Sequence, residues 1–154
     1  MLTKTEQDIK WMQHAIQLAK HAESIDEVPV GAVIVKNNEI VAKGWNQPIT
    51  GNDPTAHAEV VALRAAAEAL SNYRLVDTTM YVTLEPCTMC AGALIHARVS
   101  RVVFGATDPR TGAAGSVFDI LTTKKLNHVI DVEQGVLEHE CAQLLKDFFK
   151  SKRK

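Results

Sequence analysis

The sequence predicts an α/β domain with a mixed, largely parallel sheet that carries helices on both faces. Two observations lead to this fold class. Segments with helical periodicity alternate with short β-branched runs, an order that typically gives strands joined by crossing helices. The 154 residues also contain no internal repeat, low-complexity tract or linker. This length suits a single core, so we expect residues 1–154 to form one domain.

The elements are expected in the order α, β, β, α, β, α, β, β, α. The first helix, near residues 4–23, begins with a capping-box pattern in which Glu6 follows Thr3. Asn37 and Asn38 tolerate the positive φ of a tight turn, and we expect them to join two strands in a β-hairpin. The remaining expected elements are the hairpin strands 28–35 and 39–46, helix 57–70, strand 79–84, helix 87–97, strands 101–105 and 127–132, and a last amphipathic helix marked by Leu137, Cys141, Leu144, Leu145 and Phe148.

Three segments are expected just beyond the carboxyl ends of strands. They are Gly44 to Asn46, Glu85 to Cys87 and Gly105 to Arg110. Ligands of open α/β sheets usually bind at that edge, so these segments are the first place to look for a site.

The composition indicates a globular protein that functions in the cytoplasm. Hydrophobic residues make up 46% of the chain and charged residues 23%. The longest apolar run, Val28 to Val35, is too short to span a bilayer, and the first ten residues lack the apolar core of a signal peptide. Three cysteines, two of them in a C-x-x-C pair, favour metal or redox chemistry over a disulfide framework.

The net charge of −1 is distributed unevenly along the chain. Residues 98–125 carry 5 basic and 2 acidic side chains, and residues 146–154 carry 5 and 1. Such basic stretches can bind a polyanion even when the whole protein is close to neutral. A solvated, frayed helix end would explain the basic terminus equally simply, so both interpretations stay open.

Three potential metal ligands lie near the starts of two expected helices. Cys87 and Cys90 are three residues apart, which places both sulfurs on one side of a first helical turn. The free N–H groups there favour thiolate, the form that binds metal, and we expect Pro86 in that turn as well. His57 follows Pro54 at the start of the preceding helix. Two sulfurs and one nitrogen are typical of zinc, and three protein ligands leave a fourth position for water, as in catalytic sites.

The sequence offers no convincing fourth ligand. His96 is too far along its helix, Cys141 lies on the apolar stripe of the last helix, and His139 is expected to face solvent. Glu59, two residues after His57, is instead suited to exchange protons with a water at the metal. A glutamate that merely complements the dipole of its helix remains the alternative interpretation.

Together, HAE at 57–59 and PCTMC at 86–90 resemble the H-x-E and P-C-x-x-C signature of the zinc-dependent nucleoside and nucleobase deaminases. The similarity extends over nearly the whole chain. The first helix, the hairpin ending in GWN, the stretch YVTLEPCTMCAGALIHARVSRVVFGATDPRTGA and the basic last helix resemble the bacterial tRNA-specific adenosine deaminase family.

This resemblance implies a three-layer α/β/α, cytidine-deaminase-like fold with a five-stranded mixed sheet, and a homodimer. It implies hydrolysis of adenosine to inosine at the wobble position of an arginine tRNA, bound through the anticodon stem-loop. A hydroxide activated by one zinc per chain would attack, and a glutamate would shuttle protons. The implied site residues are His57, Cys87 and Cys90 for the metal, Glu59 for catalysis, and Asn46 and Asp108 for the substrate. Ala58 is a further expected substrate contact. Phe148 fits the core stripe of the last helix, so Phe149 is the better candidate for an exposed contact with a base.

Two alternatives belong to different classes. A deaminase of a free base or nucleotide, such as guanine, cytidine or deoxycytidylate, would use the same chemistry. The basic stretches disfavour it, and free-cytidine deaminases usually carry cysteine where this chain has His57. A non-catalytic zinc module is disfavoured by Glu59 and by the open fourth position.

Overall fold

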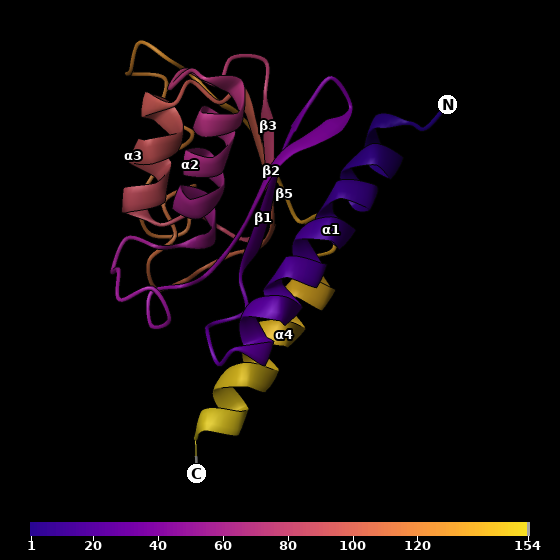
Figure 1. The fold of residues 1–154 in the computed structure, drawn as a ribbon, viewed down its shortest axis with the longest axis vertical. Helices are drawn as coiled ribbons and strands as arrows, with labels where there is room; N and C mark the ends of the chain where they lie inside the picture. The colour runs from indigo at the N-terminus through magenta and orange to yellow at the C-terminus, as the bar shows by residue number, and fades with distance from the viewer. Residues whose placement is uncertain (154) are drawn as a thin grey trace.

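A five-stranded sheet separates two layers of helices in this protein (Figure 1). The computed structural model describes residues 1–153. Helices α1 (Lys4–Ser24) and α4 (Glu138–Lys152) cover one face of the sheet, and α2 (Ala58–Leu70) and α3 (Thr88–His96) cover the other. The strands are β1 (Gly31–Lys36), β2 (Glu39–Trp45), β3 (Thr79–Leu84), β4 (Arg101–Ala106) and β5 (Asp131–Gln134). The three-layer fold and its five-stranded mixed sheet are therefore confirmed.

The expectation of a mixed, largely parallel sheet is confirmed, because β2, β3, β4 and β5 all run in the same direction and β1 alone is reversed. In the order β2-β1-β3-β4-β5, β1 is antiparallel to both of its neighbours, and only β3–β4 and β4–β5 are parallel pairs. The physical reason for the reversal is the hairpin, because β1 enters the sheet between β2 and β3 and runs against both. Strands β2, β3 and β4 all point the same way, so the three segments that follow them gather at one edge.

Local sequence signals set the beginning of the fold. The capping box is present, with Glu6 N–H donating to Thr3 Oγ1 at 3.1 Å and the Glu6 carboxylate accepting from the Thr3 N–H. Asn37 and Asn38 have φ of 51° and 61°, which confirms the tight hairpin turn. Strand β1 begins three residues later than expected, after Pro29, which has no N–H to give to a neighbouring strand.

The apolar core lies on both faces of the sheet. Side chains that alternate along each strand point to opposite faces. Ile34, Met80 and Phe104 therefore pack under α2 and α3. Val33 and Val103 face α1 and α4. In residues 1–153, no helix is both long and apolar enough to cross a membrane.

A buried ion pair joins α1 to the sheet. The Asp8 carboxylate, 4% exposed, accepts hydrogen bonds from both terminal nitrogens of Arg101 at 2.9 and 2.8 Å and from the Tyr81 hydroxyl at 2.8 Å. Burial alone would raise the pKa of Asp8, but the hydrogen bonds from Arg101 and Tyr81 outweigh burial and lower it. The layer of α1 is thus anchored to β3 and β4 on the face away from α2 and α3.

Candidate metal and active site

Helix α2 begins directly against the end of β2. This approach requires Gly44, because a Cβ there would lie only 2.2 Å from the carbonyl oxygen of Ala58. Asn46, one residue beyond β2, accepts a hydrogen bond from the Ala58 N–H through Oδ1 at 2.8 Å. The Asn46 carboxamide therefore caps α2 from outside the helix. Since its oxygen accepts this bond, its amino group is the donor that it presents on the other side.

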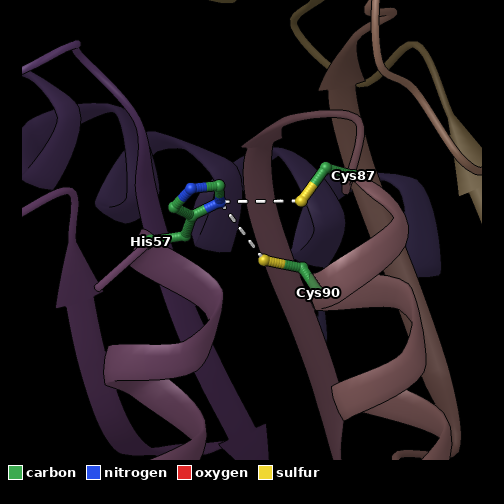
Figure 2. A group of neighbouring side chains, drawn as sticks. All are labelled: His57, Cys87 and Cys90. Carbon is green, nitrogen blue, oxygen red and sulfur yellow. Dashed lines mark hydrogen bonds between the residues drawn. The ribbon is translucent and has the colours of Figure 1, made fainter. Parts of the chain in front are cut away.

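His57 and Cys87 are the N-cap residues of α2 and α3, and neither side chain caps its helix. Both point instead into the space between the two helix starts (Figure 2). His57 Nδ1 lies 3.6 Å from Cys87 Sγ and 3.5 Å from Cys90 Sγ. Pro86 precedes the N-cap, so its expected place in the first turn is wrong, although both cysteines do lie at the start of α3.

The spacing of these three side chains fits zinc. Their ligand atoms all lie within 4.8 Å of one another, and they form the only such group of three or more found in residues 1–153. Tetrahedral zinc with bonds of about 2.3 Å to sulfur and about 2.0 Å to nitrogen separates the two atoms by roughly 3.5 Å. The nitrogen–sulfur separations of 3.6 and 3.5 Å match that value.

Electrostatics favour a thiolate at this place. A hydrogen bond from Cys90, aided by His57, lowers the pKa of the Cys87 thiol to about 4. The hydrogen bond with Cys87, followed by burial, raises the pKa of the Cys90 thiol. The pKa of His57 is raised, mainly by its contact with Cys87. The pKa values of the two thiols are thus shifted in opposite directions, and a Cys87 thiolate would be a ready ligand for a cation.

Glu59 lies next to the group formed by His57, Cys87 and Cys90 but does not belong to it. It is in the first turn of α2, as expected, and is only 4% exposed. The pKa of Glu59 is raised to about 7, mainly by burial. The nearby Cys87 also acts to raise it, and His57 acts to lower it. Its carboxylate is not part of the His57, Cys87 and Cys90 group. A buried carboxyl that can hold or release a proton near neutral pH suits acid–base chemistry.

The side chains considered as further ligands lie elsewhere. Cys141 is 1% exposed in the core between α4 and the sheet, as expected. His139 and His96 are exposed, so the structure agrees with a site of three protein ligands. On α4, Phe148 is 8% exposed and Phe149 46%, which confirms that the first belongs to the core stripe and the second faces outward.

The contacts of Asp108 and Ala58 limit how each residue could contact a substrate. The Asp108 carboxylate accepts hydrogen bonds from the N–H groups of Arg110 and Thr111 at 3.0 and 3.2 Å and from the Thr111 hydroxyl at 2.8 Å. It therefore shapes its own loop. Ala58 is fully buried, and its N–H is donated to Asn46, so only its position behind the site can matter.

Two buried glutamates were not singled out from the sequence. Glu27, 1% exposed, accepts hydrogen bonds from the N–H groups of Ile49 and Thr50 and holds the loop that follows Asn46. Glu85, 2% exposed, accepts hydrogen bonds from the loop that follows β4. The only signal in the sequence was that each glutamate stands directly beside an apolar run that is buried. A carboxylate without a partner is uncommon in such a place.

Comparison with known proteins agrees with this geometry. The family model for the cytidine and deoxycytidylate deaminase zinc-binding region matches residues 5–106. The chain therefore belongs to this family of zinc-dependent hydrolytic deaminases.

Relatives within the family narrow the class. The chain is 52% identical to a tRNA-specific adenosine deaminase of Haemophilus influenzae, over 97% of this chain and 87% of the relative. It is 47% identical to one of Bacillus subtilis, over 96% and 92%. A solved structure from work on A-to-I editing by tRNA:A34 deaminases at the wobble position superimposes with a TM-score of 0.85 and 43% identity, over 88% of this chain and 99% of that one. Within the family, the chain is thus grouped with the tRNA-specific adenosine deaminases.

Proposed function

We propose that this protein hydrolyses adenosine to inosine at the wobble position of a tRNA, with an arginine tRNA as the first substrate to test. The observation that carries the proposal is the convergence of His57, Cys87 and Cys90 beside the buried Glu59, in a chain 52% identical to a tRNA-specific adenosine deaminase. The three ligands would hold zinc and leave one coordination position free. The same observation disfavours a purely structural zinc site, which normally uses four protein ligands.

The chain's own residues supply the proton transfers. Bound zinc lowers the pKa of a water ligand to about 7. Glu59 accepts a proton from the attacking water and passes it to N1 of the purine as the oxygen adds to C6. Glu59 next takes the remaining proton of that water from the new C6 hydroxyl group and delivers it to the amino group, which leaves as ammonia, so adenosine and water give inosine and ammonia. The base must first leave its stack, which costs least in a single-stranded loop such as an anticodon.

The substrate would lie over the shared edge of β2, β3 and β4. Asn46 would donate a hydrogen bond to the nucleoside through Nδ2, and Ala58 would form the floor behind it. Asp108 retains lone pairs for a ribose 2′-OH, since each carboxylate oxygen can accept more than one hydrogen bond. Phe149, exposed on α4, would stack on a neighbouring base.

The preference for RNA tests the role of Asp108. Asp108→Asn keeps an oxygen for the loop amides but weakens acceptance from a 2′-OH. We expect the ratio of activity on RNA to activity on single-stranded DNA to fall. An unchanged ratio would exclude Asp108 from sugar recognition.

A second copy of the chain is the partner that we propose for the outer face of α2 and α3. An apolar groove runs between these helices, with Tyr73, 69% exposed, at its border. Exposed apolar surfaces of this kind are typical of subunit interfaces. The groove is lined by Val60, Leu63, Arg64, Ala67, Leu75, Ala93, His96 and Ala97. Sedimentation should show a dimer, and Tyr73→Asp, at the exposed border of the groove, should shift it to monomer. Because tRNA is found in the cytoplasm, we also propose that this protein acts in the cytoplasm.

The decisive experiment combines activity with zinc content. Purified protein is incubated with total tRNA, inosine is located by sequencing, and free nucleosides serve as substrate controls. Glu59→Ala should keep its zinc and melting temperature and lose roughly 10²- to 10⁴-fold or more of the rate, the typical contribution of a general acid–base group. Glu68→Ala, at an exposed position of the same helix, is the matched control and should behave as the parent.

The outcomes separate the alternatives. A Glu59→Ala variant that has lost its zinc would make Glu59 a ligand, and one that still deaminates near the parent rate would remove it from the mechanism. Activity of the parent on free guanine or cytidine, with none on tRNA, would favour the free-base or nucleotide deaminase.

A further inference from the structure

The segment from Asp108 to Ser116 folds around one buried carboxylate. Glu85, the first residue after β3, is 2% exposed. Its Oε1 accepts from the Asp108 N–H at 2.9 Å and from the Ser116 hydroxyl, and its Oε2 accepts from the N–H groups of Ala114 and Ser116 at 2.9 and 3.2 Å. Four donors from both ends of one loop thus converge on a single side chain.

An anionic acceptor fits this arrangement best. Every partner of Glu85 donates, and three of the four donors are backbone N–H groups, which cannot reverse their role. A buried charge is tolerated when hydrogen bonds satisfy it, and such charge-assisted bonds are stronger than neutral ones. The carboxylate of Glu85 therefore organises the loop more strongly than an amide of the same shape would.

The same loop is joined to the turn that carries a metal ligand. The Ala113 N–H donates to the Pro86 carbonyl oxygen at 2.8 Å, and Gly112 forms an isolated β-bridge with Cys87. Gly112 also lies against Glu85, because a Cβ at that position would be 2.4 to 2.5 Å from the carboxyl atoms. The loop can approach this closely only because residue 112 has no side chain.

We propose that Glu85 is a positioning residue that fixes the Asp108–Ser116 loop against the turn containing Cys87. One carboxylate then sets the distance between the His57, Cys87 and Cys90 group and the loop that would meet the RNA beside the target base. This inference rests on the proposed function for its effect on substrate, whereas the loop geometry does not depend on that function. Because Glu85 is enclosed by its own loop, it acts on the reaction through Asp108 and not by touching the base.

Glu85→Gln tests this role with the smallest change in shape. The amide must place its NH₂ group at one of the two oxygen positions. At the Oε2 position it would oppose two backbone N–H groups, whereas at the Oε1 position the Ser116 hydroxyl can turn to accept. The amide therefore prefers the Oε1 position, where it faces the Asp108 N–H, and the end of the loop that contains Asp108 loses its anchor.

Two measurements define the expected result for Glu85→Gln. Amide hydrogen exchange in residues 108–116 should become about tenfold faster or more, while exchange in β3 and β4 stays as in the parent. KM for an anticodon stem-loop should rise about tenfold with kcat changed less than about threefold, since binding contacts are lost and the proton transfers are not. Zinc content should remain one per chain.

Two further variants keep the test decisive. Ser116→Ala removes one donor at an exposed position and should give a smaller change in the same direction, even if Glu85→Gln folds poorly. Glu39→Gln, in the exposed hairpin, makes the same chemical change elsewhere and should alter nothing.

Parent-like exchange in both Glu85→Gln and Ser116→Ala would overturn the positioning role. A loss of kcat at unchanged KM would also overturn it, by placing Glu85 in the chemistry. If the parent fails to deaminate tRNA, the proposed function fails, and the exchange measurements alone still decide whether Glu85 holds the loop.

Discussion

Asn46 makes two separable contacts, and separating them is the sharpest test of the site. Its Oδ1 accepts the Ala58 N–H at 2.8 Å and caps α2, and its Nδ2 is proposed to donate to the nucleoside. Asn46→Asp keeps an acceptor for Ala58 and removes the donor. Asn46→Ala removes both. The two variants should therefore agree in activity and differ in stability.

The expected magnitudes follow from these contacts. Loss of a capping hydrogen bond costs about 1 kcal/mol, which lowers the melting temperature of a chain of this size by about 2–4 °C. Asn46→Ala should show that decrease. Asn46→Asp should not, because a carboxylate at the start of α2 also interacts favourably with the helix dipole. Loss of the substrate hydrogen bond, worth about 1–3 kcal/mol, should reduce kcat/KM roughly 5- to 150-fold in both variants.

The assay pairs thermal unfolding with inosine formation at low and moderate salt. Salt screens any repulsion between the new carboxylate and RNA phosphates, but it does not restore a missing donor. Asn72→Asp is the matched control, because Asn72 also accepts a backbone N–H, from Arg74, at an exposed turn. Parent-like kcat/KM in Asn46→Asp would refute the donor role, and an unchanged melting temperature in Asn46→Ala would refute the cap.

Three other predictions concern the metal, acid stability and the basic terminus. Cys87→Ala should lose zinc and stability together, whereas Cys141→Ala should keep its zinc; full occupancy in Cys87→Ala, by elemental analysis, would exclude it as a ligand. Because the pKa of Asp8 is lower in the folded protein than in the unfolded chain, where it is about 3.9, the ionised Asp8 stabilises the fold at pH values above 3.9. This contribution is lost as the pH falls through the pKa that Asp8 has in the folded protein. Asp8→Asn should thus be less stable than the parent at pH 7, by urea unfolding, and the gap should narrow in acid. Removing residues 151–154, of which Lys154 lies outside the described residues, should weaken tRNA binding and flatten its salt dependence without moving the edited position; an unchanged slope would mark a solvated end.

The sequence predicted those features whose signals are local. The capping box of α1, the Asn37–Asn38 turn and the two helix starts with candidate metal ligands each depend on a few neighbouring residues. The order of the strands was not predicted, because it depends on where β1 inserts between β2 and β3. No local pattern encodes that choice.

The residues that support the loops of the site were not predicted from the sequence for a related reason. Glu85 meets donors 23 to 31 positions further along the chain, and Glu27 meets donors 22 and 23 positions away. A single acidic residue beside a strand gives no hint of such partners. Periodicity likewise indicated that Asn46 lay near the end of a strand, but the bond between Asn46 and the start of α2 appears only when the layers are packed.

His57 and Cys87, the proposed ligands, are 30 positions apart at the starts of different helices, so no short stretch of chain contains the whole proposed site. An unfolded chain would have to close that loop without help from the sheet, and its affinity for zinc should be poor. We therefore expect the ion to bind after the three layers have assembled and to stabilise contacts that form late in folding. Such contacts slow unfolding more than they speed folding. We expect zinc to govern how long this enzyme persists once folded, while the sheet and its hairpin govern how fast the fold is reached.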